Sequence, residues 1–107
     1  MSQDRTGQIA VIFLSRRTGE DEAGYAEAAA AMDELAARQP GYRGMDSVRG
    51  PDGAGITVSW WADEASAVAW RRDLDHTAIR EAGRARWYEA YEVAVASVGR
   101  SYRWTKP

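Results

Sequence analysis

Apolar residues along the 107-residue chain follow two periods, one typical of strands and one typical of helices. Residues 8–15 (QIAVIFLS) form a short apolar run rich in β-branched side chains, which predicts a strand buried on both faces. From 22 to 39, mostly apolar residues recur at helical spacing: Tyr25, Ala28, Ala29, Met32, Leu35, Ala36 and Gln39. Because most of this stripe is alanine, we expect the helix to lie close to a sheet. Pro40 and Gly41 end it, since proline cannot continue a helix.

A strand pair follows this helix. Residues 42–49 (YRGMDSVR) predict a second strand, and residues 50–55 (GPDGAG) predict a tight hairpin turn. Residues 56–62 (ITVSWWA) predict a third strand, whose faces both lack charge. Alternation places Trp60 and Trp61 on opposite faces of this strand. We therefore expect one of these indoles beneath the helices and the other at a subunit interface, without a preference for which.

The second half of the chain predicts helix and then strand. Asp63 is a suitable N-cap for a helix that follows it. We expect a break in this helix near residues 73–75, where Asp75 would cap a short helix over about 76–86. Residues 88–104 (YEAYEVAVASVGRSYRW) end in a long predicted strand with apolar residues on both faces.

The resulting order is β-α-β-β-α-β, the ferredoxin-like pattern of an α+β domain with an antiparallel sheet. We expect one domain over residues 1–107, with residues 1–7 and 105–107 flexible. Helices cover only one face of such a sheet, yet three of the four predicted strands are apolar on both faces. A second copy of the chain is the simplest cover for the other face, so we predict a homodimer formed through the sheet.

The composition of the chain argues against several classes of function. The net charge is −2 with acids and bases interspersed, so no basic block indicates nucleic acid and no basic amphipathic face indicates a membrane surface. The chain has no cysteine and one histidine, which argues against a metal site. The first residues (MSQDRTGQ) lack the pattern of a signal peptide, and no apolar run reaches membrane-spanning length. We therefore expect a cytoplasmic protein.

Four stretches of the chain resemble a known family. They are AVIFLSRRTG, LAARQPGYRGMDSVRG, ITVSWWADEASAVAWRRDLDH and GRARWYEAYEVAVASVGRSYRW, which together run from about residue 10 to 104. They resemble the antibiotic biosynthesis monooxygenase (ABM) family of dimeric α+β barrel proteins. The resemblance implies a homodimer with a pocket for a small apolar or aromatic ligand.

The resemblance also implies two chemistries. Some members of the family oxidise polycyclic aromatic compounds with molecular oxygen, without flavin or metal, and others bind and degrade haem. Both commonly use an asparagine on the first strand and a tryptophan in the second-helix region. This chain has no asparagine, whereas Trp70 matches the tryptophan. The haem-ligand position, ten residues after that tryptophan, is Arg80, or Gly83 if the loop carries an insertion. His76 does not match it.

Oxygenation without a cofactor requires a base, donors that stabilise a substrate anion, and an apolar cavity. His76, whose side chain type titrates near neutrality, is a candidate base, and Trp70 is its candidate catalytic partner. The candidate substrate-binding residues are Phe13, Met32, Trp60, Trp61, Arg84 and Tyr88. Each also has a structural interpretation: His76 in the first turn of a helix, Arg84 on a solvated face, and Met32 in the core.

The leading functional hypothesis is a cofactor-independent monooxygenase acting on a small aromatic or enolisable metabolite. It requires no cofactor and no metal. The alternative is a non-catalytic small-molecule-binding or stress-related protein of the same fold, which the missing asparagine favours. A haem-binding or haem-degrading protein is the third hypothesis.

Overall fold

The computed structural model of the chain describes residues 4–76 and 86–107, with the side chains of 74–76 left out. Its elements, in chain order, are β1 (Ile9–Arg17), α1 (Glu22–Ala37), β2 (Tyr42–Arg49), β3 (Ala54–Trp61), α2 (Glu64–His76) and β4 (Tyr88–Ser97). The strands form an antiparallel sheet in the order β2-β3-β1-β4. The predicted ferredoxin-like order is confirmed.

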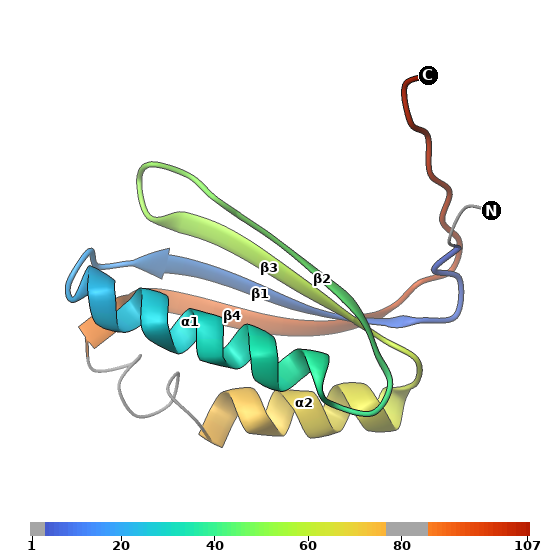
Figure 1. Cartoon of the computed structure of the whole chain (residues 1–107), viewed down its shortest axis with the longest axis horizontal. Helices are drawn as coiled ribbons and strands as arrows, with labels where there is room; N and C mark the ends of the chain where they lie inside the picture. The colour runs from blue at the N-terminus through green and yellow to red at the C-terminus, as the bar shows by residue number, and fades with distance from the viewer. Residues whose placement is uncertain (1–3, 77–85) are drawn as a thin grey trace.

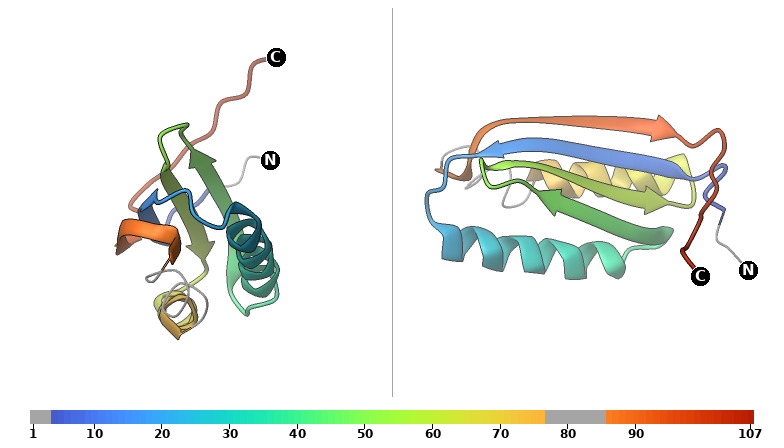
Figure 2. Two further views of the ribbon diagram at one scale, coloured as in Figure 1. Left: turned by 90° about the vertical axis from the view of Figure 1, so that its left-hand side faces the viewer. Right: turned by 90° about the horizontal axis from the view of Figure 1, so that it is seen from above.

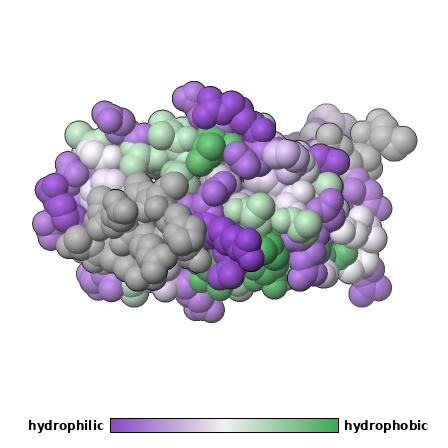
Figure 3. Space-filling model, turned by 90° about the horizontal axis from the view of Figure 1, so that it is seen from below, coloured by the Kyte–Doolittle hydropathy of each residue, from purple (hydrophilic) through white to green (hydrophobic). Residues whose placement is uncertain are grey.

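Both helices lie on the same face of the sheet (Figure 1). The two turned views show α2 beneath the middle of the sheet and α1 beside β2 (Figure 2). Alternation along the central strand directs Val11 and Phe13 toward the helices, and Ile12 and Leu14 away from them. Seen from the helix side, hydrophobic residues reach the surface between hydrophilic ones (Figure 3).

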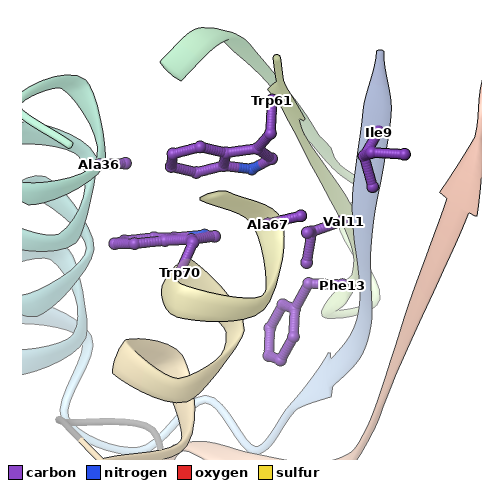
Figure 4. Packing of buried hydrophobic residues seen from close by; sticks show 7 residues of the cluster. All are labelled: Ile9, Val11, Phe13, Ala36, Trp61, Ala67 and Trp70. Carbon is purple, nitrogen blue, oxygen red and sulfur yellow. The ribbon is translucent and has the colours of Figure 1, made fainter. Parts of the chain in front are cut away.

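The core lies between α2 and the sheet. It consists of Ile9, Val11, Phe13, Ala36, Trp61, Ala67 and Trp70. The indoles of Trp61 and Trp70 stack with ring centroids 5.6 Å apart and planes 28° apart (Figure 4). Trp61 is fully buried, and its Nε1–H donates to the hydroxyl of Ser59 at 2.9 Å. The polar edge of this indole is thus satisfied inside the core, as a buried N–H requires.

The packing of α1 differs from the prediction. The helix ends at Ala37, two residues earlier than expected, with Arg38 as its C-cap. Ala36 is its only buried residue, and the expectation that the alanine stripe brings the helix against the sheet is wrong. The alanine side chains are too small to fill the space between this helix and the sheet. Space therefore remains beside Ala28 and Ala29.

The helix α2 is longer than predicted. Asp63 caps it as expected, because its carboxylate accepts a hydrogen bond from the backbone N–H of Ser66 at 2.8 Å. The predicted break at 73–75 is wrong: the helix continues through His76. Aspartate is tolerated inside helices, and residues 64–76 contain neither glycine nor proline. Asp75 is therefore not a cap, and the predicted short helix at 76–86 falls mostly on residues outside the described part.

Three strand boundaries also differ. β1 extends to Arg17, because Arg16 still pairs with Ala54 of β3. β3 begins at Ala54, so the hairpin turn is shorter than the predicted 50–55. β4 ends at Ser97, and the strand predicted within 88–104 is too long, since residues 98–107 have no regular structure. Beyond Ser97 the chain continues into Gly99, which favours departure from the strand.

The sheet face opposite the helices is apolar and not covered by this chain. Ile12, Leu14 and Val58 are half-buried there, while Ile56 and Val48 are 42% and 70% exposed. This agrees with the prediction that three of the strands are apolar on both faces. The predicted cover by a second copy of the chain stays a prediction.

Candidate functional site

A cavity of about 120 Å³ lies between α1 and the helix-facing side of the sheet. Its apolar wall is formed by side chains from β1, β2 and both helices: Val11, Phe13, Ala28, Ala29, Met32, Met45 and Trp70. Trp70 is 2% exposed and held by its stack on Trp61, so this part of the wall is rigid. The cavity exists because α1 carries alanines where α2 carries an indole.

Two tyrosines meet at one end of the cavity. Tyr25 stands in the first turn of α1 and Tyr88 begins β4, and both line the cavity. Their rings are edge to face, with centroids 6.0 Å apart. Burial raises the pKa of the Tyr88 hydroxyl, and the neighbouring Tyr25 raises it further. Tyr88 therefore stays protonated over the ordinary pH range and is a hydrogen-bond donor rather than a base.

Asp21 holds these two walls together. Its carboxylate accepts a hydrogen bond from the backbone N–H of Gly24 at 3.2 Å, which caps α1. The same side chain accepts from Nε1 of Trp87, the residue before β4, also at 3.2 Å. The Trp87 hydrogen bond lowers the pKa of Asp21. One carboxylate thus fixes the start of α1 to the start of β4.

Two arginines surround Tyr25. Arg49 donates from Nη2 to the Tyr25 hydroxyl oxygen at 2.7 Å. The guanidinium of Arg17 lies 3.5 Å from the centre of the Tyr25 ring, a cation–π contact. Arg17 pairs through Nη1 with Glu22 and its side chain is 6% exposed. Its Nε and Nη2 are buried without a hydrogen-bond acceptor among the described residues.

Hydroxyls line the floor of the cavity. Ser47 of β2 and Thr57 of β3 face each other with their hydroxyl oxygens 2.8 Å apart, and Ser59 follows on the same face. Asp33 of α1 is the carboxylate of the described lining, and partial burial raises its pKa. The cavity is therefore apolar in its walls and polar at its floor and one end, which is the usual composition of a small-molecule site.

The predicted site residues divide into three groups. Phe13, Met32, Tyr88 and Trp70 line the cavity. Trp61 is buried beside Trp70 outside the lining, and alternation places Trp60 on the opposite face of the sheet. Arg84 lies outside the described residues, and the backbone of His76 ends α2 while its side chain is not described.

Sequence reasoning missed Tyr25, Arg17 and Arg49 as site residues. Tyr25 had a signal, because it is the one aromatic side chain at the start of an alanine stripe. Thr57 and Ser59 also had one, since strand parity places them on the face of Trp61. Arg17 had none: its burial depends on Tyr25 and Glu22, which follow it across a loop.

Among the described residues, no group of three or more histidine, cysteine, aspartate or glutamate side chains could hold a metal ion. In the same part of the chain, neither helix has the length and apolar character that crossing a bilayer requires.

The fold and the cavity define a class: a ferredoxin-like α+β domain with a cavity between one helix and the sheet. The model of the antibiotic biosynthesis monooxygenase family matches residues 8–82. The chain therefore belongs to the antibiotic biosynthesis monooxygenase family, and the resemblance seen in the sequence is confirmed.

Individual relatives agree with this assignment. The chain is 50% identical over 91 residues to the uncharacterized protein YqjZ of Bacillus subtilis, covering 85% of this chain and 79% of that protein. Its fold is similar to that of SnoaB, a cofactor-independent oxygenase from Streptomyces nogalater, with a TM-score of 0.69, 18% identity and coverage of 95% and 99% of the two chains. A conserved protein from Methanosarcina mazei gives a TM-score of 0.73 at 12% identity, covering 88% of this chain and 95% of that one. At these identities the solved structures show a shared fold.

Proposed function

We propose that the protein is a cofactor-independent monooxygenase that oxidises a small aromatic or enolisable compound with molecular oxygen. The observation that carries this proposal is the cavity itself, whose apolar walls include the rigid indole of Trp70 and whose end carries two tyrosine hydroxyls. Family membership and the shared fold with SnoaB, an oxygenase without a cofactor, support the reaction type.

The reaction requires that the substrate supply the electrons. For a hydroquinone, the balanced change is hydroquinone plus O₂ to hydroxyquinone plus water. One oxygen atom replaces a ring hydrogen as a hydroxyl, and the two phenolic oxygens become carbonyls. The second oxygen atom leaves as water. The two oxygen atoms together accept four electrons, and the substrate supplies all four. Ionising the substrate makes it electron-rich enough to begin this transfer, which is why donors to the anion matter.

The base remains a prediction. His76 at the end of α2 is the residue proposed from the sequence, with Trp70 beside the substrate. Asp33 is a second candidate, because it lines the cavity and its raised pKa makes its carboxylate a better proton acceptor. A base must also lie within hydrogen-bond reach of the proton it removes.

Oxygen uptake by the purified protein tests the proposal. We expect wild-type protein to consume oxygen with at least one member of a panel of anthrones, hydroquinones and hydroxyquinones. Trp70→Phe should lower kcat/KM by roughly tenfold or more, because the smaller ring loosens the substrate wall. Trp60→Phe is the matched control on the opposite sheet face and should leave uptake unchanged. Absence of uptake with the whole panel would overturn the proposal.

A second function is favoured by one observation. β1 directs Val11 and Phe13 into the cavity, and neither side chain has a polar group to offer a ligand. The chain also has no asparagine. A protein that binds a small aromatic ligand without oxidising it would need no more than this cavity. Ligand binding without oxygen uptake would favour this function over the first.

We also propose that two copies pair through the open face of the sheet. The support is the apolar set on that face, above all Ile56 and Val48, which a monomer leaves in water. Light scattering should give twice the mass of the 11.8 kDa chain, and Ile56→Asp should halve it. Localisation in the cytoplasm stays a prediction.

A further inference from the structure

Two aromatic side chains near the C-terminus stand in solvent. Beyond Ser97, the tail of residues 98–107 leaves the sheet at the end opposite the β2–β3 hairpin and turns away from the helices (Figure 1). In this tail, Tyr102 is 94% exposed and Trp104 is 73% exposed. Aromatic side chains usually bury most of their surface in a core or an interface. The tail therefore carries apolar surface that its own chain leaves uncovered.

A groove crosses the open face of the sheet beside the hairpin. Its floor is a row of apolar side chains from three neighbouring strands: Val48 of β2, Ile56 of β3 and Leu14 of β1. Glu92 of β4 continues this row, because it pairs with Leu14. The groove is thus apolar along its floor and has a carboxylate at its β4 edge.

The aromatic residues of the tail cannot reach the groove of their own chain. The Ser101 hydroxyl accepts a hydrogen bond from the backbone N–H of Arg5 at 2.8 Å, which holds the tail at the far end of the sheet. Trp104 follows three residues later, so it lies at most roughly 10 Å from this point. Glu92 lies five residues before Ser97, so the groove begins roughly 17 Å back along β4.

A second copy of the chain brings a tail to the groove. Two sheets that pack face to face lie about 10 Å apart, which matches the reach of Trp104 beyond Ser101. Pairing with the strands turned end for end places the hairpin of one copy over the end of the sheet where the tail of the other copy leaves. Each copy then supplies one tail and one groove, as a two-fold interface requires.

The charges of the tail and the groove are complementary. The three charged residues of the tail are all basic, whereas the whole chain has a net charge of −2, so the rest of the chain is negative. At the groove, Glu92 offers a carboxylate. The positive charge of Arg16, which also lines the groove, is offset by Asp52 at 3.6 Å. A basic tail therefore meets no unbalanced positive charge from Arg16 and finds an acidic partner in Glu92.

We propose that the groove binds the C-terminal tail of a second copy, with Tyr102 and Trp104 on the apolar floor and Lys106 against Glu92. In an extended segment these three tail residues point to the same side, because they are two positions apart. The inference rests on the proposed pairing of two copies through the open face and names the segment that completes this interface.

The groove also adjoins the cavity. Arg49 lines the groove, and its Nη2 donates to the hydroxyl oxygen of Tyr25 in the cavity lining at 2.7 Å. A tail bound in the groove would shield Arg49 from solvent. The second copy would therefore contribute to the surroundings of the cavity as well as to the interface.

Disulfide cross-linking tests the contact directly, because the chain has no cysteine of its own. A Lys106→Cys chain is mixed with a Glu92→Cys chain and oxidised mildly. We expect a mixed disulfide dimer on a non-reducing gel, since the proposal brings these two positions together. Glu34→Cys, exposed on α1 on the other side of the sheet, is the matched control and should give no mixed dimer with Lys106→Cys. No product with Glu92→Cys, or as much product with Glu34→Cys, would overturn the proposal.

Dissociation of the dimer measures the contribution of the two aromatic residues. Combining Tyr102→Ala with Trp104→Ala should raise the dissociation constant at least about tenfold. Thr105→Ala, in the same tail but on its other side, should leave the constant unchanged. A double variant that dimerises like wild type, when Ile56→Asp does not, would reject the tail contact and keep the pairing of the sheets. Monomeric wild-type protein would overturn both, and none of these measurements depends on oxygen uptake.

Discussion

The two helices cover the same face of the sheet and pack against it in different ways. From α2, Ala67 and Trp70 are 0% and 2% exposed and meet Trp61 directly. From α1, Ala36 alone is buried, and the middle of the helix faces a cavity. The difference teaches that two helices of one layer can pack unequally: α2 supplies most of the helical contribution to the core, and α1 leaves a cavity between itself and the sheet.

The largest effect should come from breaking the indole stack. Trp70→Ala removes the larger part of the α2 contact and should lower the free energy of unfolding by about 3–5 kcal/mol. Met32→Ala, in the cavity wall of α1, should cost less than half as much, since Met32 is only half-buried. Urea unfolding measures both. Equal losses would mean that the two helices contribute alike.

The contact between the turn after α1 and the start of α2 should be nearly as sensitive. Gly41 has φ +84°, and an added Cβ would lie 2.2 Å from the hydroxyl oxygen of Ser66 in α2. Gly19 has φ +86° with open space around it. Gly19→Ala should therefore cost about 1–2 kcal/mol from backbone strain, and Gly41→Ala about 1–3 kcal/mol more from the clash.

Thermal and urea unfolding measure this pair. Adding Ser66→Gly to Gly41→Ala should recover part of the loss, because the obstructing side chain is then absent. If Gly41→Ala costs no more than Gly19→Ala, the turn between α1 and β2 does not approach α2 as closely as the structure shows.

Filling the two helix faces should separate stability from binding. Ala67→Leu places extra atoms in the tight contact of α2 and should cost about 1–3 kcal/mol. Ala29→Leu points into the cavity and should change stability by no more than about 0.5 kcal/mol. The same Ala29→Leu variant should lower oxygen uptake with the substrate panel at least tenfold, because the added atoms occupy the cavity. A destabilised Ala29→Leu protein would indicate that α1 is packed more closely than described.

The smallest expected effect is the loss of the stabilisation by Asp21 at low pH. The hydrogen bond from Trp87 holds the pKa of Asp21 below its ordinary 3.8. The ionised carboxylate therefore stabilises the fold above about 3.8, and this contribution is lost as the pH falls through the lowered value. We expect the difference in Tm between wild type and Asp21→Asn to shrink from neutral pH to about pH 3. A constant difference would mean that Asp21 acts only through its shape.

Much of the fold follows from local pattern, because the strands and helices depend on periodicity within short windows. The alternation around Trp60 and Trp61 predicted opposite faces, and the described core then places Trp61 under the helices. Local pattern failed at 73–75, where aspartates suited to capping were tolerated inside α2 instead. It also failed at the end of β4, since a strand ends where its partners end and not where its apolar residues do.

The candidate site was harder to predict for a physical reason. Phe13, Met32, Trp70 and Tyr88 were named from residue type, but their meeting depends on β1 pairing with β4 and on the length of the Trp61–Trp70 stack. The approach of Tyr25 to Tyr88 depends on Asp21 bonding across the fold to Trp87. Contacts of this kind join residues far apart in the chain, and no local period encodes them.

The pairing of β1 has a consequence for how the protein is made. β1 stands in the middle of the sheet, between β3 and β4, and Val11 pairs with Val95. During synthesis β1 leaves the ribosome early, whereas its partner leaves it late. Until β4 arrives, one edge of the most apolar strand stays open to other nascent chains. Stalled or truncated chains that lack β4 should therefore be prone to aggregate. Pairing of β4 with β1 is the step that covers this open edge.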